Sequence, residues 1–228
     1  MKKIAYILLL ALLLTACGKE NTQEPTVSTD PTTAPTAATA MADVEKFQKL
    51  IRDNYWYKRA LGCTFEKPED ISAEHFFYLG LSEEDEKTFE ATITAEEQAA
   101  LDNFYRQEKG KDPPTVGSAI KLPVEGINKA LSILDVTIED IEIPSHWLYY
   151  DQTNAYYFWV SDAYGVGRWE VTQVEKGTNG IVNVYWETSD VHFNTITEEH
   201  NWDGTKMVMT LQEKADGSYL VLSNVPVK

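Results

Sequence analysis

His192 and His200 are the residues whose type and surroundings come closest to a metal site. Glu198 and Glu199 directly precede His200, and Asp203 follows it. Imidazole and carboxylate groups bind divalent ions, so a loop between strands that gathered these side chains would support metal-assisted hydrolysis. The spacing matches no established zinc motif, because the helical protease motif needs two histidines four residues apart with a glutamate beside the first. We therefore treat His192, Glu199 and His200 as a hypothetical metal site, with a solvated acidic loop as the alternative.

Nucleophilic catalysis has weaker support in this sequence. The chain has no Gly-x-Ser-x-Gly segment, which would place a serine on a sharp turn after a strand. Cys63 and His75 supply a thiol and an imidazole, but one such pair does not define a hydrolase, and we expect Cys63 to be a buried apolar residue. The 36 acidic residues make any single carboxylate pair uninformative as a sign of glycoside hydrolysis. The sequence therefore indicates no catalytic residue and no cofactor.

Aromatic side chains are concentrated between residues 147 and 169. Tyrosine and tryptophan join an apolar body to a polar tip, so on a sheet they either fill the core or form a stacking face for sugars or a partner protein. Residues 156–159 are consecutive aromatics, and strand alternation puts two of them on each face. The candidate binding residues on an outward face are Tyr150, Tyr157, Trp159, Trp169 and Trp186. Packing in the core and at its rim is the alternative.

The elements that must position these residues are helices first. Apolar residues at three- and four-residue steps predict helices over 42–59, 73–80, 95–110 and 123–134, with a further turn at 137–140. Ser72 is expected to cap the second helix, and Thr94 with Glu97 has the spacing of a capping box for the third. Pro123 suits the first position of the fourth helix.

Beyond Pro144 the hydrophobic period changes to two, which predicts strands. The predicted strands cover 147–150, 156–161, 166–175, 181–187, 207–213 and 219–223. Short turns rich in Gly, Asn and Asp join them, which favours an antiparallel meander, because a parallel pair needs a crossover of about a dozen residues. We therefore predict an α+β fold in one domain, 42–228, with N-terminal helices (42–143) packed on a C-terminal antiparallel sheet (144–228). A separate helical subdomain is the alternative.

The N-terminus reads as an export signal. Lys2 and Lys3 precede an apolar run from Ile4 to Leu14, which is about half the length that a helix needs to cross a bilayer. Residues 14–18, Leu-Thr-Ala-Cys-Gly, resemble the lipobox of bacterial lipoproteins. The resemblance implies removal of residues 1–16, diacylation of Cys17 and attachment to the outer face of the cytoplasmic membrane or to the outer membrane. Two acyl chains suffice for stable anchoring.

Residues 17–41 form the predicted tether that follows this signal. Their composition is Thr, Pro, Ala, Ser and Glu, without aromatic residues or a sustained apolar period. With Cys17 carrying lipid, Cys63 has no partner within the chain, so we predict no disulfide. The tether is expected to hold the folded body away from the lipid surface.

The charge balance restricts the class of partner. Lys and Arg number 20 against 36 Asp and Glu, a net charge of −16. Nucleic acid binding is disfavoured, because it depends on basic residues that neutralise phosphates.

Three functions remain open from the sequence. The first is a lipid-anchored, non-catalytic binding module of the cell envelope that takes a wall glycan, a peptide or an envelope protein. The second is an envelope hydrolase, assisted by a metal at His192, Glu199 and His200. The third is an assembly partner of another envelope protein that binds no small ligand.

Overall fold

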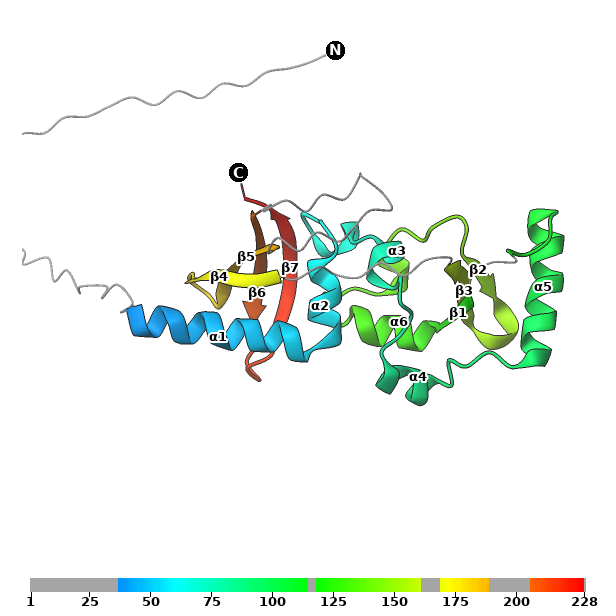
Figure 1. Ribbon diagram of the computed structural model, residues 1–228, viewed down its shortest axis with the longest axis horizontal. Coiled ribbons are helices and arrows are strands. Elements are labelled where there is room, and N and C mark those ends of the chain that lie inside the picture. Colours follow the sequence, from blue (N-terminus) through cyan, green and yellow to red (C-terminus); the bar gives the residue numbers. More distant parts are fainter. Residues whose placement is uncertain (1–36, 115–117, 161–168, 189–205, 228) are drawn as a thin grey trace, which may run out of the picture. The chain divides into compact units, whose positions relative to one another are not determined.

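The computed structural model describes residues 37–114, 118–160, 169–188 and 206–227 (Figure 1). They form helices and two antiparallel sheets, which confirms the predicted α+β class. The α-helices are α1 (Ala37–Asp53), α2 (Tyr55–Leu61), α3 (Ala73–Phe76), α4 (Glu83–Phe89), α5 (Ala95–Lys109) and α6 (Val124–Leu131), and the short 3-10 turns are η1 (Pro68–Asp70), η2 (Ile138–Asp140) and η3 (Asp151–Thr153). No helix in these ranges is long and apolar enough to span a membrane.

The larger sheet is the meander that the C-terminal strands predict. Its order is β4 (Trp169–Lys176), β5 (Ile181–Thr188), β6 (Lys206–Glu213) and β7 (Tyr219–Pro226), with every neighbouring pair antiparallel. Alternate residues of β5 and β6 are buried, as expected for a sheet with one covered face. Among them, Val184, Trp186 and Met209 are at most 1% exposed. These side chains belong to the main core.

Helix α1 is held against this sheet by apolar and polar contacts. Phe47 is fully buried, and its ring meets that of Tyr219 edge to face at 5.2 Å. The Gln48 Oε1 atom accepts a hydrogen bond of 2.6 Å from the backbone N–H of Val171 in β4. Among the described strands β4 lies at the edge of the sheet, where this bond provides a partner for its backbone N–H.

A second sheet replaces part of the single sheet expected. It has the order β1 (Ser118–Pro123), β3 (Ala155–Val160), β2 (Leu148–Tyr150), and both pairs are antiparallel. Residues 118–122 were not predicted to form a helix or a strand. Their strand conformation comes from pairing with β3 about thirty-five residues later, and strand propensity depends strongly on such pairing.

The helices also differ from expectation in several places. Pro123 ends β1 and is the N-cap of α6 rather than its first residue, and α3 ends at Phe76 rather than near residue 80. The helix predicted over 42–59 is interrupted at Asn54, whose backbone is extended and whose Oδ1 accepts hydrogen bonds from the N–H groups of Trp56 and Tyr57. Helix α4 was not predicted, because it lacks an apolar period. Its start is stabilised by Ser82 as N-cap and by four acids in its first turn. Helix α1 begins at Ala37, within the segment predicted as a tether, rather than at residue 42.

Asp85 joins three helices through one buried carboxylate. Its Oδ1 atom lies 2.6 Å from the Lys129 ammonium of α6, and its Oδ2 accepts a hydrogen bond of 3.1 Å from the Trp56 indole of α2. Burial alone would raise the pKa of this carboxyl group, but the hydrogen bonds from Lys129 and Ser82 outweigh it and lower the pKa. The charged carboxylate thus fixes α4 to its neighbours.

Asn224 of β7 is a second buried polar junction. It is fully buried, and its amide nitrogen donates to the carbonyl oxygens of Ala60, Leu61 and Cys63 at the end of α2. Its Oδ1 accepts a hydrogen bond of 3.0 Å from the indole N–H of Trp186. One side chain therefore satisfies the carboxyl end of a helix and ties it to the sheet.

Helix α5 covers the outer face of the smaller sheet. Tyr156 and Phe158 of β3 pack on the main core, whereas Tyr157 belongs to a separate small cluster with Leu101 of α5 and Ala155. The alternation predicted for the consecutive aromatic residues is therefore present, but both faces of β3 are covered. The space beside α5 and this sheet contains the candidate site.

Candidate binding pocket beside helix α5

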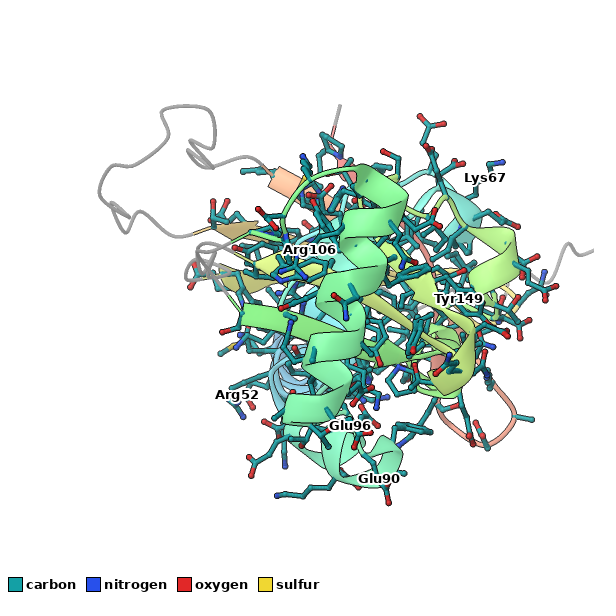
Figure 2. All side chains as sticks on the ribbon, turned by 90° about the vertical axis from the view of Figure 1, so that its right-hand side faces the viewer. Arg52, Lys67, Glu90, Glu96, Arg106 and Tyr149 are labelled. Carbon is teal, nitrogen blue, oxygen red and sulfur yellow. The ribbon has the colours of Figure 1, made fainter. Side chains whose placement is uncertain are left out.

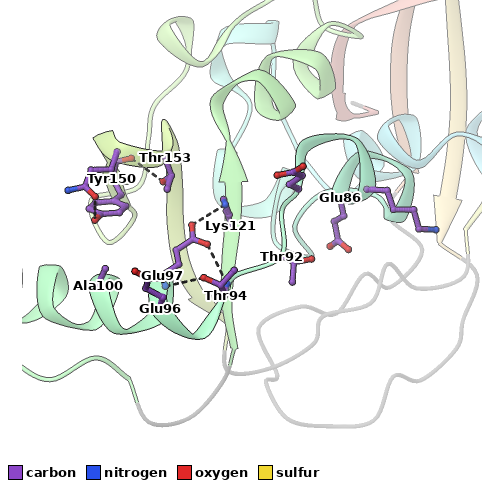
Figure 3. A pocket seen from close by; sticks show the side chains of 12 residues that line it. Glu86, Thr92, Thr94, Glu96, Glu97, Ala100, Lys121, Tyr150 and Thr153 are labelled. Atoms are coloured by element: carbon purple, nitrogen blue, oxygen red, sulfur yellow. Dashed lines mark hydrogen bonds and ion pairs between the residues drawn. The ribbon is translucent and has the colours of Figure 1, made fainter.

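An open pocket of about 740 Å³ lies between the start of α5, the end of α4 and the turn after β2 (Figure 3). Its lining is polar except for Ala100 and the ring of Tyr150. We call it the α5 pocket. Lys121 of β1 lines the α5 pocket. The strand that the sequence did not predict therefore forms one side of the pocket.

The capping box of α5 fixes Glu97 at the pocket. Thr94 is the N-cap, and its Oγ1 accepts a hydrogen bond of 3.1 Å from the Glu97 N–H. In return, the Thr94 N–H donates to Oε2 of Glu97 at 3.4 Å. This reciprocal pair confirms the predicted capping box and holds the Glu97 carboxylate over the first turn of the helix.

Glu97 also forms the polar interior of the site with residues from the sheet. The Lys121 ammonium lies 3.0 Å from Glu97 Oε1, and both side chains are only 12% exposed. The Tyr157 hydroxyl donates a short hydrogen bond to the same oxygen, and it lies 3.0 Å from Thr153 Oγ1. Both carboxylate oxygens are thus occupied by donors from α5, β1 and β3.

These contacts shift the proton equilibria in opposite directions. Burial would raise the pKa of Glu97, but hydrogen bonds from Tyr157 and Lys121 outweigh it and lower the pKa. Burial, together with the adjacent Glu97 carboxylate, raises the pKa of Tyr157 far above its ordinary range. At neutral pH Glu97 is therefore a carboxylate and Tyr157 a neutral phenol.

Charges of both signs surround this interior. Glu86, Glu90 and Glu96 line the pocket together with Lys87. Figure 2 shows Glu90 and Glu96 near the start of α5. On the opposite wall, the Tyr150 hydroxyl donates to Oε1 of Gln152 at 2.7 Å. The pocket lining consequently contains both hydrogen-bond donors and acceptors.

The structure divides the predicted aromatic binding residues. Tyr150 lines the α5 pocket, and Trp159 packs on Tyr105 and lines a second depression of about 710 Å³ along the same helix. Tyr157 is fully buried and Trp186 is 1% exposed, so the prediction that they face a ligand is wrong. Both lie on covered sheet faces, since a layer packs on each side of β3 and on the inner side of β5.

Trp169 and Cys63 both pack in or against the main core. Trp169 is partly buried and packs against the main core. Cys63 is 1% exposed, which confirms its predicted burial, and desolvation raises the pKa of its thiol to about 12. It is therefore a packing residue rather than a nucleophile.

The remaining predictions fall on other parts of the chain. His192, Glu199 and His200 lie outside the described residues, as does Cys17. Within the described ranges, no group of three or more His, Cys, Asp and Glu side chains is arranged to hold a metal ion.

Sequence reasoning missed Lys121, Thr153 and the pocket-lining position of Glu97. The capping-box spacing revealed Glu97 as a helix residue, but its contact with Lys121 depends on the pairing of β1 with β3. Comparison of the chain with protein-family models, with curated proteins and with solved structures returns no match.

Proposed function

We propose that this protein is a non-catalytic binding module of the bacterial cell envelope, anchored by lipid on Cys17 and using the α5 pocket to hold its ligand. The lipobox and the polar segment after it support the anchor and the extracytoplasmic location. The observation that carries the binding function is the preorganised Glu97–Lys121 pair within a pocket of ligand size.

The chemistry of the pocket favours binding over catalysis. Its described lining contains neither histidine nor cysteine, the usual general base and thiol nucleophile. Both oxygens of Glu97 accept hydrogen bonds already, so this carboxylate is not free to take a proton from a substrate. Fixed polar groups of this kind orient a ligand without reacting with it.

The anchor is tested by replacing the lipidated residue. In a bacterial host, the wild-type chain should incorporate labelled fatty acid and fractionate with membranes. The Cys17→Ser variant should incorporate none and lose its membrane association. The matched control is Cys63→Ala, which removes the other cysteine of the chain and should leave lipid labelling intact. Label on the Cys17→Ser protein would refute the anchor.

The pocket is tested by a thermal-shift screen of residues 17–228 carrying Cys17→Ser, which we call the mature Cys17→Ser chain. The panel contains wall glycan fragments, short peptides, and divalent cations with and without a chelator. A ligand at about 100 times its dissociation constant stabilises the protein by about 2.7 kcal/mol. Ala100→Trp should abolish this shift, because Ala100 lines the pocket, whereas Ala99→Trp on the exposed side of α5 should preserve it.

Two results would contradict the proposal. A shift that persists in Ala100→Trp would place the ligand elsewhere. No shift from any compound would favour the alternative of a protein partner, to be identified by cross-linking in the native envelope.

A further inference from the structure

We infer that the ligand of the α5 pocket is a neutral, polyhydroxylated molecule of the saccharide class, an inference that rests on the binding function proposed above for the same pocket. Three features of the lining carry it: the hydrogen-bonding capacity of Lys121, the mixture of charges, and the ring of Tyr150.

Lys121 has more hydrogen-bond donors than its described contact uses. An ammonium group carries three N–H donors, and the described contact of this one is the pair with Glu97 at 3.0 Å. The side chain is 12% exposed and lines the pocket, so its remaining donors are largely shielded from bulk water. A hydroxyl or ether oxygen of a ligand at this point would accept from a donor that is costly to leave unpaired.

The charges disfavour an anionic ligand. An anion that approached Lys121 would also face Glu86, Glu90 and Glu96. The ammonium groups of Lys121 and Lys87 are themselves paired with the carboxylates of Glu97 and Glu83. A hydroxyl group donates to a carboxylate and accepts from an ammonium group equally well. Several hydroxyls on one neutral molecule therefore satisfy both signs of charge without bringing like charges together.

Tyr150 and Gln152 line the opposite wall of the pocket and also suit a saccharide. Tyr150 lines the pocket while its ring packs against Phe104 and Tyr157, and its hydroxyl donates to Oε1 of Gln152. That bond leaves the two amide donors of Gln152 for ligand oxygens. A sugar ring presents apolar C–H groups on its faces and hydroxyls around its edge, which suits a ring wall beside polar groups. The cavity of about 740 Å³ has room for such a ligand.

The test is isothermal titration of the mature Cys17→Ser chain with defined probes. The neutral probes are maltotriose, N,N′-diacetylchitobiose and the compounds of a neutral glycan array. The charged probes are citrate, spermidine and the zwitterionic dipeptide alanyl-alanine. We expect a neutral saccharide to bind, with loss of binding in Ala100→Trp and wild-type affinity in Ala99→Trp.

Variants of the two recognition groups sharpen the result. Lys121→Met should weaken saccharide affinity by about 10-fold or more, the cost of a lost hydrogen bond to a charged donor. Tyr150→Ala should weaken it as well, whereas Tyr150→Phe, which keeps the ring, should retain most of the affinity. Tyr149→Ala is the matched control, because Tyr149 is 41% exposed on the same strand and does not line the pocket.

The outcomes separate this inference from the binding function itself. Binding of a charged probe that Ala100→Trp blocks, with no neutral saccharide bound at millimolar concentration, would overturn the saccharide class and leave the binding function in place. Absence of binding by every probe, or binding that ignores Ala100→Trp, would overturn both.

Discussion

Glu97 illustrates how a single side chain serves helix formation and site geometry together. Through Thr94 it completes the cap of α5, and through Lys121 and Tyr157 it fixes that helix to the smaller sheet. The Glu97 and Lys121 side chains are each only 12% exposed. Their mutual attraction therefore has to compensate for the hydration that both charges lose on folding.

We predict that Glu97→Gln lowers the free energy of unfolding at neutral pH by about 3 kcal/mol, because Lys121 becomes a buried charge without a counterion. Urea denaturation measures the change. Glu96→Gln is the control, since Glu96 is the exposed neighbour in the same turn and its change should stay within about 0.5 kcal/mol.

The same pair predicts a pH dependence. The pKa of Glu97 is lowered in the folded protein, so its stabilisation is complete at neutral pH and is lost as the pH falls below about 4, the ordinary carboxyl range. The difference in stability between the wild type and Glu97→Gln should therefore shrink on acidification. A difference that stayed constant down to about pH 3 would contradict the lowered pKa.

Asn224 is the second residue on which a sharp prediction rests. Asn224→Ala should lower the free energy of unfolding by about 3 kcal/mol, because the Trp186 indole and buried carbonyls of α2 lose their partners. Chemical denaturation monitored by tryptophan fluorescence measures the loss. Asn183→Ala is the control, since it removes one partly exposed hydrogen bond with Thr210 and should cost less than about 1 kcal/mol. Equal losses would refute the special role of Asn224.

At the scale of elements, the junction between α1 and α2 depends on Asn54. Asn54→Ala removes the side-chain acceptor for the N–H groups of Trp56 and Tyr57, so we expect a loss of about 1 kcal/mol. Differential scanning calorimetry gives the change in Tm. Asn103→Ala, at an exposed position inside α5, should leave Tm nearly unchanged. An unchanged Tm for Asn54→Ala would show that packing alone sets the break.

Local signals in the sequence predicted those elements whose ends are marked by short-range chemistry. The capping box at Thr94, the cap at Ser72 and the alternating strands after Pro144 all appear where expected. Strand β1 and helix α4 did not, because the first depends on pairing with distant β3 and the second lacks an apolar stripe.

At the scale of the whole molecule, the candidate site was less predictable than the fold class. Aromatic density pointed to β3, but a sequence does not reveal that both faces of β3 are covered, which buries Tyr157. The pocket joins the α4 end, α5, β1 and the turn after β2, four segments that tertiary packing alone brings together. Of the five predicted aromatic binding residues, Tyr150 is the one that lines the α5 pocket.

Because Cys63 is buried, the rate at which its thiol reacts with a reagent measures local opening of the folded protein. In Cys17→Ser it is the sole thiol of the chain, and a pKa of about 12 keeps it unreactive while it is enclosed. Cys63 follows α2 and its carbonyl accepts a hydrogen bond from Asn224, so we expect separation of α2 from β7 to expose the thiol to a labelling reagent. We expect slow alkylation of the native protein and much faster alkylation of its Asn224→Ala version, followed by mass spectrometry. Equal rates would mean that the thiol is exposed by a motion that leaves this junction closed.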